Sequence, residues 1–124
     1  MIMSEKSVVN FTNKMPNPMF PTVFDVTCEE VFEKKDGVHL IDVRRPDEYT
    51  GDLGHIPGAT LITLDEIPSR KNELPTTGTI VFICRSGGRS AQASAMAKEA
   101  GLQNVFNMQG GMMAWNDKKF KVER

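Results

Sequence analysis

The sequence predicts an α/β domain built on a mainly parallel sheet. Short apolar, β-branched segments alternate along the chain with segments of helical character, and the connections between them are short. Two of these apolar segments, residues 38–43 and 79–83, are almost continuously hydrophobic, as strands buried on both faces of a parallel sheet are. The 124 residues suffice for one such domain and are too few for two.

The secondary-structure elements follow in a regular order. Strands are predicted at residues 22–24, 38–43, 59–61, 79–83 and 104–107. Helices are predicted at residues 28–35, 46–50, 64–71 and 90–100, and after Gly110 and Gly111. Thr27 can cap the first helix, and Gly101 suits the left-handed position that ends the fourth. Residues 1–21, which contain three prolines, are expected to form an N-terminal arm or loose leader, and residues 22–124 the domain.

Composition and charge narrow the classes of function. The net charge is -1, from 15 basic and 16 acidic residues, which argues against nucleic acid or an anionic membrane as a partner. The N-terminus lacks the pattern of a secretory signal, and no apolar run approaches the ~20 residues of a membrane helix. The two cysteines form no disulfide framework, and no cysteine and histidine have metal-ligand spacing. We therefore expect a cytoplasmic monomer that uses neither metal nor cofactor.

The segment from Cys84 to Ser90 carries the strongest chemical signal. Cys84 follows the clearest strand, the glycines at 87 and 88 permit a tight turn, and a helix begins directly afterwards. This arrangement can direct backbone N–H groups and the positive end of a helix at one sulfur atom. Arg85 and Arg89 would favour a reactive thiolate, and Ser86 and Ser90 could donate hydrogen bonds to the sulfur or to its substrate.

The same segment is also compatible with a purely structural role. Most unpaired cysteines in strands are small core side chains, and most Gly-Gly pairs are simple turns. A core cysteine would not be expected between two arginines, two serines and a helix start, so we take Cys84 as the candidate nucleophile. Residues 85–90 are the candidate substrate-binding loop.

Four blocks of the sequence resemble the rhodanese family of sulfurtransferases in its single-domain form. They lie in the family's order at residues 40–49, at residues 54–59, in the Cys84 loop and at residues 110–115. The resemblance implies a central five-stranded parallel sheet and a cysteine that cycles between thiolate and persulfide. It further implies that Asp42 helps to hold the active-site loop, that Arg44 and Glu48 form a structural ion pair, and that His55 serves the fold.

The implied reaction moves sulfane sulfur from thiosulfate or another small anionic donor to cyanide, a thiol or a protein cysteine. Two other functions stay open at this point. A non-catalytic rhodanese-like module would bind a protein partner instead. A phosphatase or arsenate reductase would use a similar loop, but only four residues separate Cys84 from Arg89, which suits a single sulfur atom better than a phosphoryl group.

Overall fold

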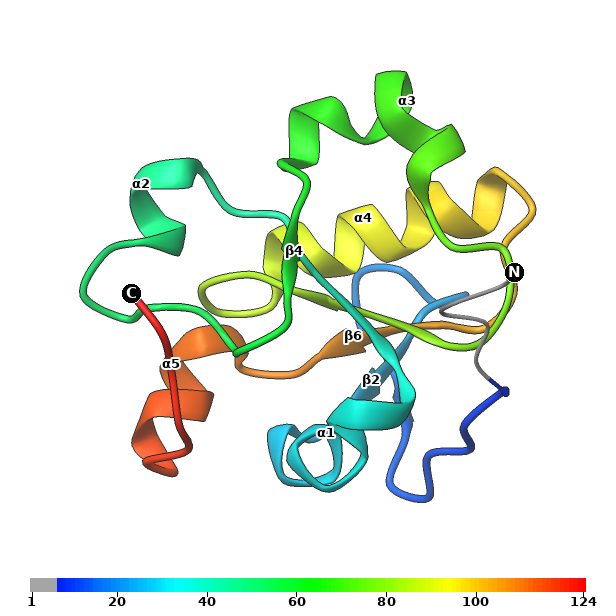
Figure 1. Ribbon diagram of the computed structural model, residues 1–124. Helices are drawn as coiled ribbons and strands as arrows, with labels where there is room; N and C mark the ends of the chain where they lie inside the picture. Colours follow the sequence, from blue (N-terminus) through cyan, green and yellow to red (C-terminus); the bar gives the residue numbers. More distant parts are fainter. Residues whose placement is uncertain (1–6) are drawn as a thin grey trace.

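The computed structural model describes residues 7–124 and contains one six-stranded sheet. The strands lie in the spatial order β1-β2-β6-β5-β3-β4, and every neighbouring pair is parallel except β1 and β2 (Figure 1). Their bounds are Met15–Pro16 (β1), Phe24–Val26 (β2), His39–Asp42 (β3), Thr60–Leu61 (β4), Ile80–Ile83 (β5) and Val105–Met108 (β6). The predicted α/β class with a mainly parallel sheet is confirmed, with six strands instead of five because β1 adds an antiparallel edge.

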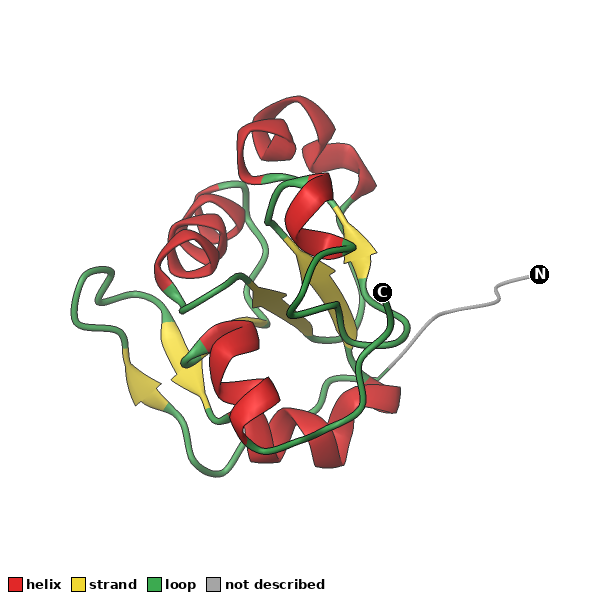
Figure 2. Cartoon of the chain, turned by 90° about the vertical axis from the view of Figure 1, so that its left-hand side faces the viewer, coloured by secondary structure: helices red, strands yellow, loops and turns green. Residues whose placement is uncertain are grey.

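The helices cover both faces of this sheet (Figure 2). The α-helices are α1 (Cys28–Lys34), α2 (Pro46–Tyr49), α3 (Ile67–Arg70), α4 (Gly88–Glu99) and α5 (Gly111–Asp117). Successive strand residues face opposite sides, so Val81 and Ile83 pack toward α1 and α5, whereas Ile80 and Phe82 pack toward α3 and α4. None of the helices within residues 7–124 has the length and apolar character needed to cross a bilayer.

Two of the predicted helices differ from the structure at their boundaries. The segment expected as one helix at 64–71 is a short α3 between two 3-10 turns, Leu64–Glu66 and Lys71–Glu73. Pro68 lies near the N-terminus of α3, where its missing N–H is tolerated, so a longer helix cannot pass through it. Helix α4 begins at Gly88, two residues earlier than expected, and Gly87 precedes it in a left-handed conformation without a side chain that could cap the helix.

The described part of the N-terminal arm, from Ser7 onward, packs against the domain instead of hanging loosely; residues 1–6 lie outside the described part. Phe11 is buried in the core and its ring lies 5.1 Å from that of Phe106. The buried carboxylate of Glu30 accepts hydrogen bonds from the backbone N–H groups of Thr12 and Asn13, at 2.7 and 3.0 Å. The proline-rich composition predicted an absence of helix here, but it could not predict a docked edge strand.

Candidate functional site

The Cys84 loop lies at the carboxyl ends of the two central strands. Cys84 directly follows β5, and the neighbouring strand β3 runs parallel to it, with Asp42 beside Ile83. The N–H of Val43 donates to the carbonyl of Ile83 at 2.9 Å, which joins the two strand ends. In Figure 1 the loop emerges at the left of the sheet, on the same side as α2 and α5. This is the edge at which ligands bind in parallel α/β sheets.

The sulfur of Cys84 is held by two of the predicted loop residues. The N–H of Gly87 donates a hydrogen bond to Sγ at 3.0 Å, and the Ser90 hydroxyl oxygen lies 3.2 Å from Sγ. Gly87 can point its N–H at the sulfur because its φ is 113°, a conformation that costs other residues energy. Cys84 as a whole is only 1% exposed, so the loop covers its own sulfur.

The first turn of α4 adds further hydrogen-bond donors to the same loop. The backbone N–H groups of Gly88, Arg89 and Ser90 have no acceptor within residues 7–124, as expected for the start of a helix. The first intrahelical bond is donated by Ala91 to the carbonyl of Gly87. A helix start with free N–H groups favours a negative charge nearby.

Helix α5 fixes the loop from the other side, through residues whose role the sequence did not reveal. The N–H groups of Met112 and Met113 donate to the carbonyls of Cys84 and Arg85, at 2.8 and 3.0 Å. Gly111 permits this approach, because a Cβ at its position would overlap the backbone of Cys84 and Arg85. The Gly-Gly pair at 110–111 was the available signal, and it indicated only the start of a helix.

Asp42 and Arg44 form a buried ion pair with one another, and neither side chain hydrogen-bonds to the Cys84 loop. Arg44 Nη2 lies 2.7 Å from Asp42 Oδ2, and the two side chains are 1% and 0% exposed. Arg44 also donates to the carbonyls of Glu48 and Gly54, so it ties the end of β3 to the segment after α2. Asp42 instead lies beside Ile83, the residue that precedes Cys84, so a supporting role in holding the loop stays a prediction.

The carboxylate of Glu48 pairs with Arg89 and not with Arg44, which corrects the implied Arg44–Glu48 ion pair. Two parallel hydrogen bonds of 2.7 and 2.9 Å join the Arg89 guanidinium to Glu48. The hydrogen bonds from Arg89 lower the pKa of Glu48 from 4.5 to about 2, in spite of partial burial. Arg89 thus anchors α4 to α2, and its charge is largely balanced by Glu48.

This ion pair predicts an acid-sensitive contribution to stability. The folded-state pKa of Glu48 is depressed, so its contribution is complete above the unfolded carboxyl value, near 4.3, and is lost as the pH falls toward 2. We expect Glu48→Gln to lower the free energy of unfolding by about 1 kcal/mol at neutral pH. The difference in the free energy of unfolding between Glu48→Gln and the wild type should shrink as the pH falls from about 4.5 to 2. Chemical denaturation across that range measures it. The neighbouring exposed Asp47→Asn serves as the control, and an equal, pH-independent loss in both variants would contradict the prediction.

The other predicted loop residues lie at the surface beside a cavity. The Arg85 side chain is exposed and has no ion-pair partner within residues 7–124. Ser86 and Gly88 are exposed and line a cavity of about 370 Å³. The Ser86 hydroxyl makes no hydrogen bond to Cys84 Sγ in this structure, unlike that of Ser90. Residues 17–20 of the N-terminal arm form another wall of this cavity.

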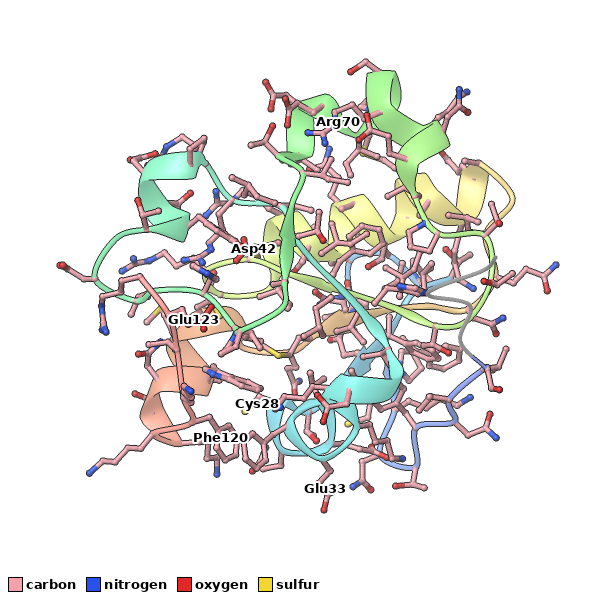
Figure 3. All side chains as sticks on the ribbon, in the orientation of Figure 1. Cys28, Glu33, Asp42, Arg70, Phe120 and Glu123 are labelled. Atoms are coloured by element: carbon pink, nitrogen blue, oxygen red, sulfur yellow. The ribbon has the colours of Figure 1, made fainter. Side chains whose placement is uncertain are left out.

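Cys28 and His55 both contribute to packing and lie apart from the Cys84 loop. Cys28 starts α1, as Figure 3 shows, and is buried in the cluster on the α1 and α5 side. Cys84 belongs to the cluster on the other face of the sheet. Burial, reinforced by Glu29, raises the pKa of Cys28 to about 11. His55 stacks on Tyr49 with 3.7 Å between ring centroids, and its Nδ1 lies 2.8 Å from the Tyr49 carbonyl oxygen.

Comparison with known proteins identifies the family. The model of the Rhodanese-like domain family matches residues 27–118. This chain belongs to the rhodanese family. A protein named Sulfurtransferase from Allochromatium vinosum is 40% identical over 80 residues, which cover 64% of this chain and 73% of the relative. Thiosulfate sulfurtransferase GlpE of Pseudoalteromonas translucida is 33% identical, with 77% of this chain and 89% of the relative covered. The match to uncharacterized YqhL of Bacillus subtilis, 38% identical, spans 64% of this chain and only 61% of that relative.

Solved rhodanese structures share the fold. A rhodanese-related protein from Thermoplasma volcanium superposes with a TM-score of 0.73 at 25% identity, over 78% of this chain and 94% of that one. The resemblance derived from the four sequence blocks is therefore confirmed. Taken with the relatives, it supports a rhodanese-type sulfurtransferase role in general terms.

Proposed function

We propose that this protein transfers sulfane sulfur through a persulfide on Cys84. The observation that carries the proposal is the environment of the Cys84 sulfur, which combines the Gly87 N–H, the Ser90 hydroxyl and the uncapped start of α4. Preorganised N–H donors around one point stabilise an anionic sulfur without a compensating cation in contact. A persulfide carries its negative charge on the outer sulfur, which extends beyond Sγ, and the free N–H groups of α4 are suited to receive it.

The bonds formed and broken in the proposed reaction balance without a cofactor. The Cys84 thiolate attacks the terminal sulfur of a donor such as thiosulfate, a new S–S bond forms, and the donor's own S–S bond breaks to release sulfite. A thiolate or cyanide acceptor then attacks the outer sulfur and leaves the Cys84 thiolate. The name of the GlpE relative supports thiosulfate as donor. The exposed guanidinium of Arg85, which has no ion-pair partner within residues 7–124, supports an anionic donor. Since Cys84 is 1% exposed, the donor is expected to approach over Ser86 and Gly88, which line the cavity beside the loop.

The geometry of this site supports phosphoryl transfer less well than sulfur transfer. Arg89, which would have to bind a phosphoryl group, holds both of its terminal nitrogens against the Glu48 carboxylate. Turnover of a phosphate ester that disappears in Cys84→Ser would favour that chemistry over sulfur transfer.

Intact-protein mass spectrometry after incubation with thiosulfate tests the proposal. We expect the wild type to gain one sulfur atom that cyanide removes, and Cys84→Ser to gain none. Cys28→Ser is the matched control and should gain the sulfur like the wild type, because Cys28 is buried and its raised pKa keeps it a neutral thiol.

Three other results would change part or all of the proposed function. A gain with glutathione persulfide but not with thiosulfate would keep the mechanism and replace the donor. No gain with either donor in folded, reduced protein would favour a non-catalytic binding module. A sulfur gain that survives in Cys84→Ser would overturn the assignment of Cys84.

A further inference from the structure

A chain of buried polar side chains connects the Cys84 sulfur to the N-terminal arm. Ser90 Oγ, which lies 3.2 Å from Sγ, is hydrogen-bonded to Asn107 Oδ1 on β6. Asn107 Nδ2 donates to Asp25 Oδ1 on β2 at 2.8 Å, and Asn17 Nδ2 donates to the same oxygen at 2.9 Å. All four linked residues, Ser90, Asn107, Asp25 and Asn17, are at least nine-tenths buried.

The hydrogen-bonding capacity of these groups determines which atom faces which. Asn17 Oδ1 accepts from the N–H groups of Met19 and Phe20, so the amide nitrogen of Asn17 must face Asp25. The Asp25 carboxylate only accepts, and it therefore also requires the amide nitrogen of Asn107. The remaining atom of the Asn107 amide, Oδ1, faces Ser90 and can only accept. Asp25 in this way fixes the orientation of Asn107.

Ser90 has a single hydroxyl proton and two neighbours that compete for it. While Cys84 is a thiol, Ser90 can donate to Asn107 Oδ1 and accept the S–H, so both contacts are hydrogen bonds. When the sulfur is an anion, it has no proton to give, and the contact is favourable only if Ser90 turns its proton to the sulfur. Asn107 Oδ1 then loses its donor in a buried position, which costs free energy.

We propose that Asn107, oriented by Asp25, is a positioning residue that competes with the Cys84 sulfur for the Ser90 proton. The Ser90 hydroxyl then acts as a two-position switch that points to Asn107 beside the thiol and to the sulfur beside a thiolate or persulfide anion. Asn107 thereby disfavours the anionic sulfur relative to the thiol. The role of this switch in turnover rests on the proposed sulfur transfer, whereas its effect on ionisation does not.

Other charged groups around Cys84 also bear on its ionisation, and the experiment must hold them constant. Arg89 interacts with Cys84 from α4, and Arg85 follows it in the loop with an exposed side chain. Asp42 and Arg44 lie at the end of the neighbouring β3, Glu48 is linked to Cys84 through Arg89, and Asp25 through Asn107. None of these charges changes when Asn107 or Ser90 is replaced by an uncharged residue. A shift caused by such a replacement is therefore a hydrogen-bonding effect.

Titration of the thiolate by its ultraviolet absorbance tests the switch without any sulfur donor. We expect Asn107→Leu to move the Cys84 midpoint to lower pH by about 0.7 unit, the equivalent of one neutral hydrogen bond. In a Ser90→Ala background the same replacement should have no effect, because there is no proton to compete for. Cys28 ionises near pH 11 and forms a separate step, which Cys28→Ser identifies.

A second variant and a matched control keep the test decisive. Asp25→Asn preserves shape and lets the Asn107 amide turn over, but it also removes a negative charge. It should therefore lower the midpoint more when Ser90 is present than in the Ser90→Ala background, and only this difference reports on the switch. Ser94→Ala removes another buried hydroxyl one helical turn along α4, where it donates to the Ser90 carbonyl, and should leave the midpoint unchanged. The switch is refuted if Asn107→Leu leaves the midpoint in place, if its shift persists in Ser90→Ala, or if the Asp25→Asn shift is the same with and without Ser90. If Asn107→Leu shifts the Cys84 midpoint as expected but the protein forms no persulfide, the proposed function is contradicted and the switch is not.

Discussion

Replacing Arg44 by methionine is expected to lower the free energy of unfolding by about 3–5 kcal/mol. Methionine is similar in length, so little packing volume is lost, but the carboxylate of Asp42 remains in a position that is 0% exposed without its cation. The replacement also leaves the carbonyls of Glu48 and Gly54 without the guanidinium donor that joins them. Denaturant-induced unfolding followed by circular dichroism gives the difference.

The chain provides a control at the next position. Arg45 forms its ion pairs at the surface, where its side chain is 66% exposed, and Arg45→Met should change stability far less. Replacing Asp42 together with Arg44 by apolar residues should recover much of the loss, because no unpaired charge is then buried. Similar small losses at positions 44 and 45 would show that the Asp42–Arg44 pair does not hold the strand end.

Replacing Gly111 by alanine is expected to disrupt the Cys84 loop and to cost about 2–5 kcal/mol of stability. The new Cβ would overlap the carbonyl oxygen of Cys84 and the backbone of Arg85, and the φ of 56° is unfavourable for a side chain. Since the clash lies on the loop itself, we expect the uptake of sulfur by Cys84 to fall even at temperatures where the variant stays folded. Unfolding and the persulfide mass assay, run on the same sample, measure the two effects.

Gly58→Ala separates backbone strain from the clash. Gly58 has a φ of 90°, and a Cβ there would meet no atom within 4 Å, so only the conformational cost applies. We expect a loss of about 1 kcal/mol and an unchanged persulfide yield. An equal loss of persulfide in both variants would mean that the loop is not supported through Gly111.

The residues of the candidate site were predictable because they form a local pattern. A buried strand, a cysteine, two glycines and a helix start are adjacent in the sequence, and the structure brings Cys84, Gly87 and Ser90 together as expected. The strands at 38–43 and 79–83 were recognisable for the same reason, since their hydrophobic character is continuous.

Contacts between distant segments were not predictable. Arg89 pairs with Glu48 across 41 positions, and Asn107 bonds to Asp25 across 82. Asp25 and Asn107 were visible only as polar residues in or near short predicted strands, a feature that many surface strands share. The family resemblance implied that Arg44 pairs with Glu48, whereas in the structure Arg44 pairs with Asp42.

The docked arm also has a practical consequence for how the domain is delimited. The family match begins at residue 27, whereas β2 ends at Val26 and pairs along its whole length with β6. A fragment trimmed to the matched region would lose both β1 and β2 and expose the hydrogen-bonding edge of β6, which invites self-association. It would also lack Asp25, the residue that orients Asn107. The hydrogen bonds around Cys84 would therefore differ from those of the full chain. Expression and crystallisation work should therefore retain the arm, with β1 and β2, that precedes the matched region.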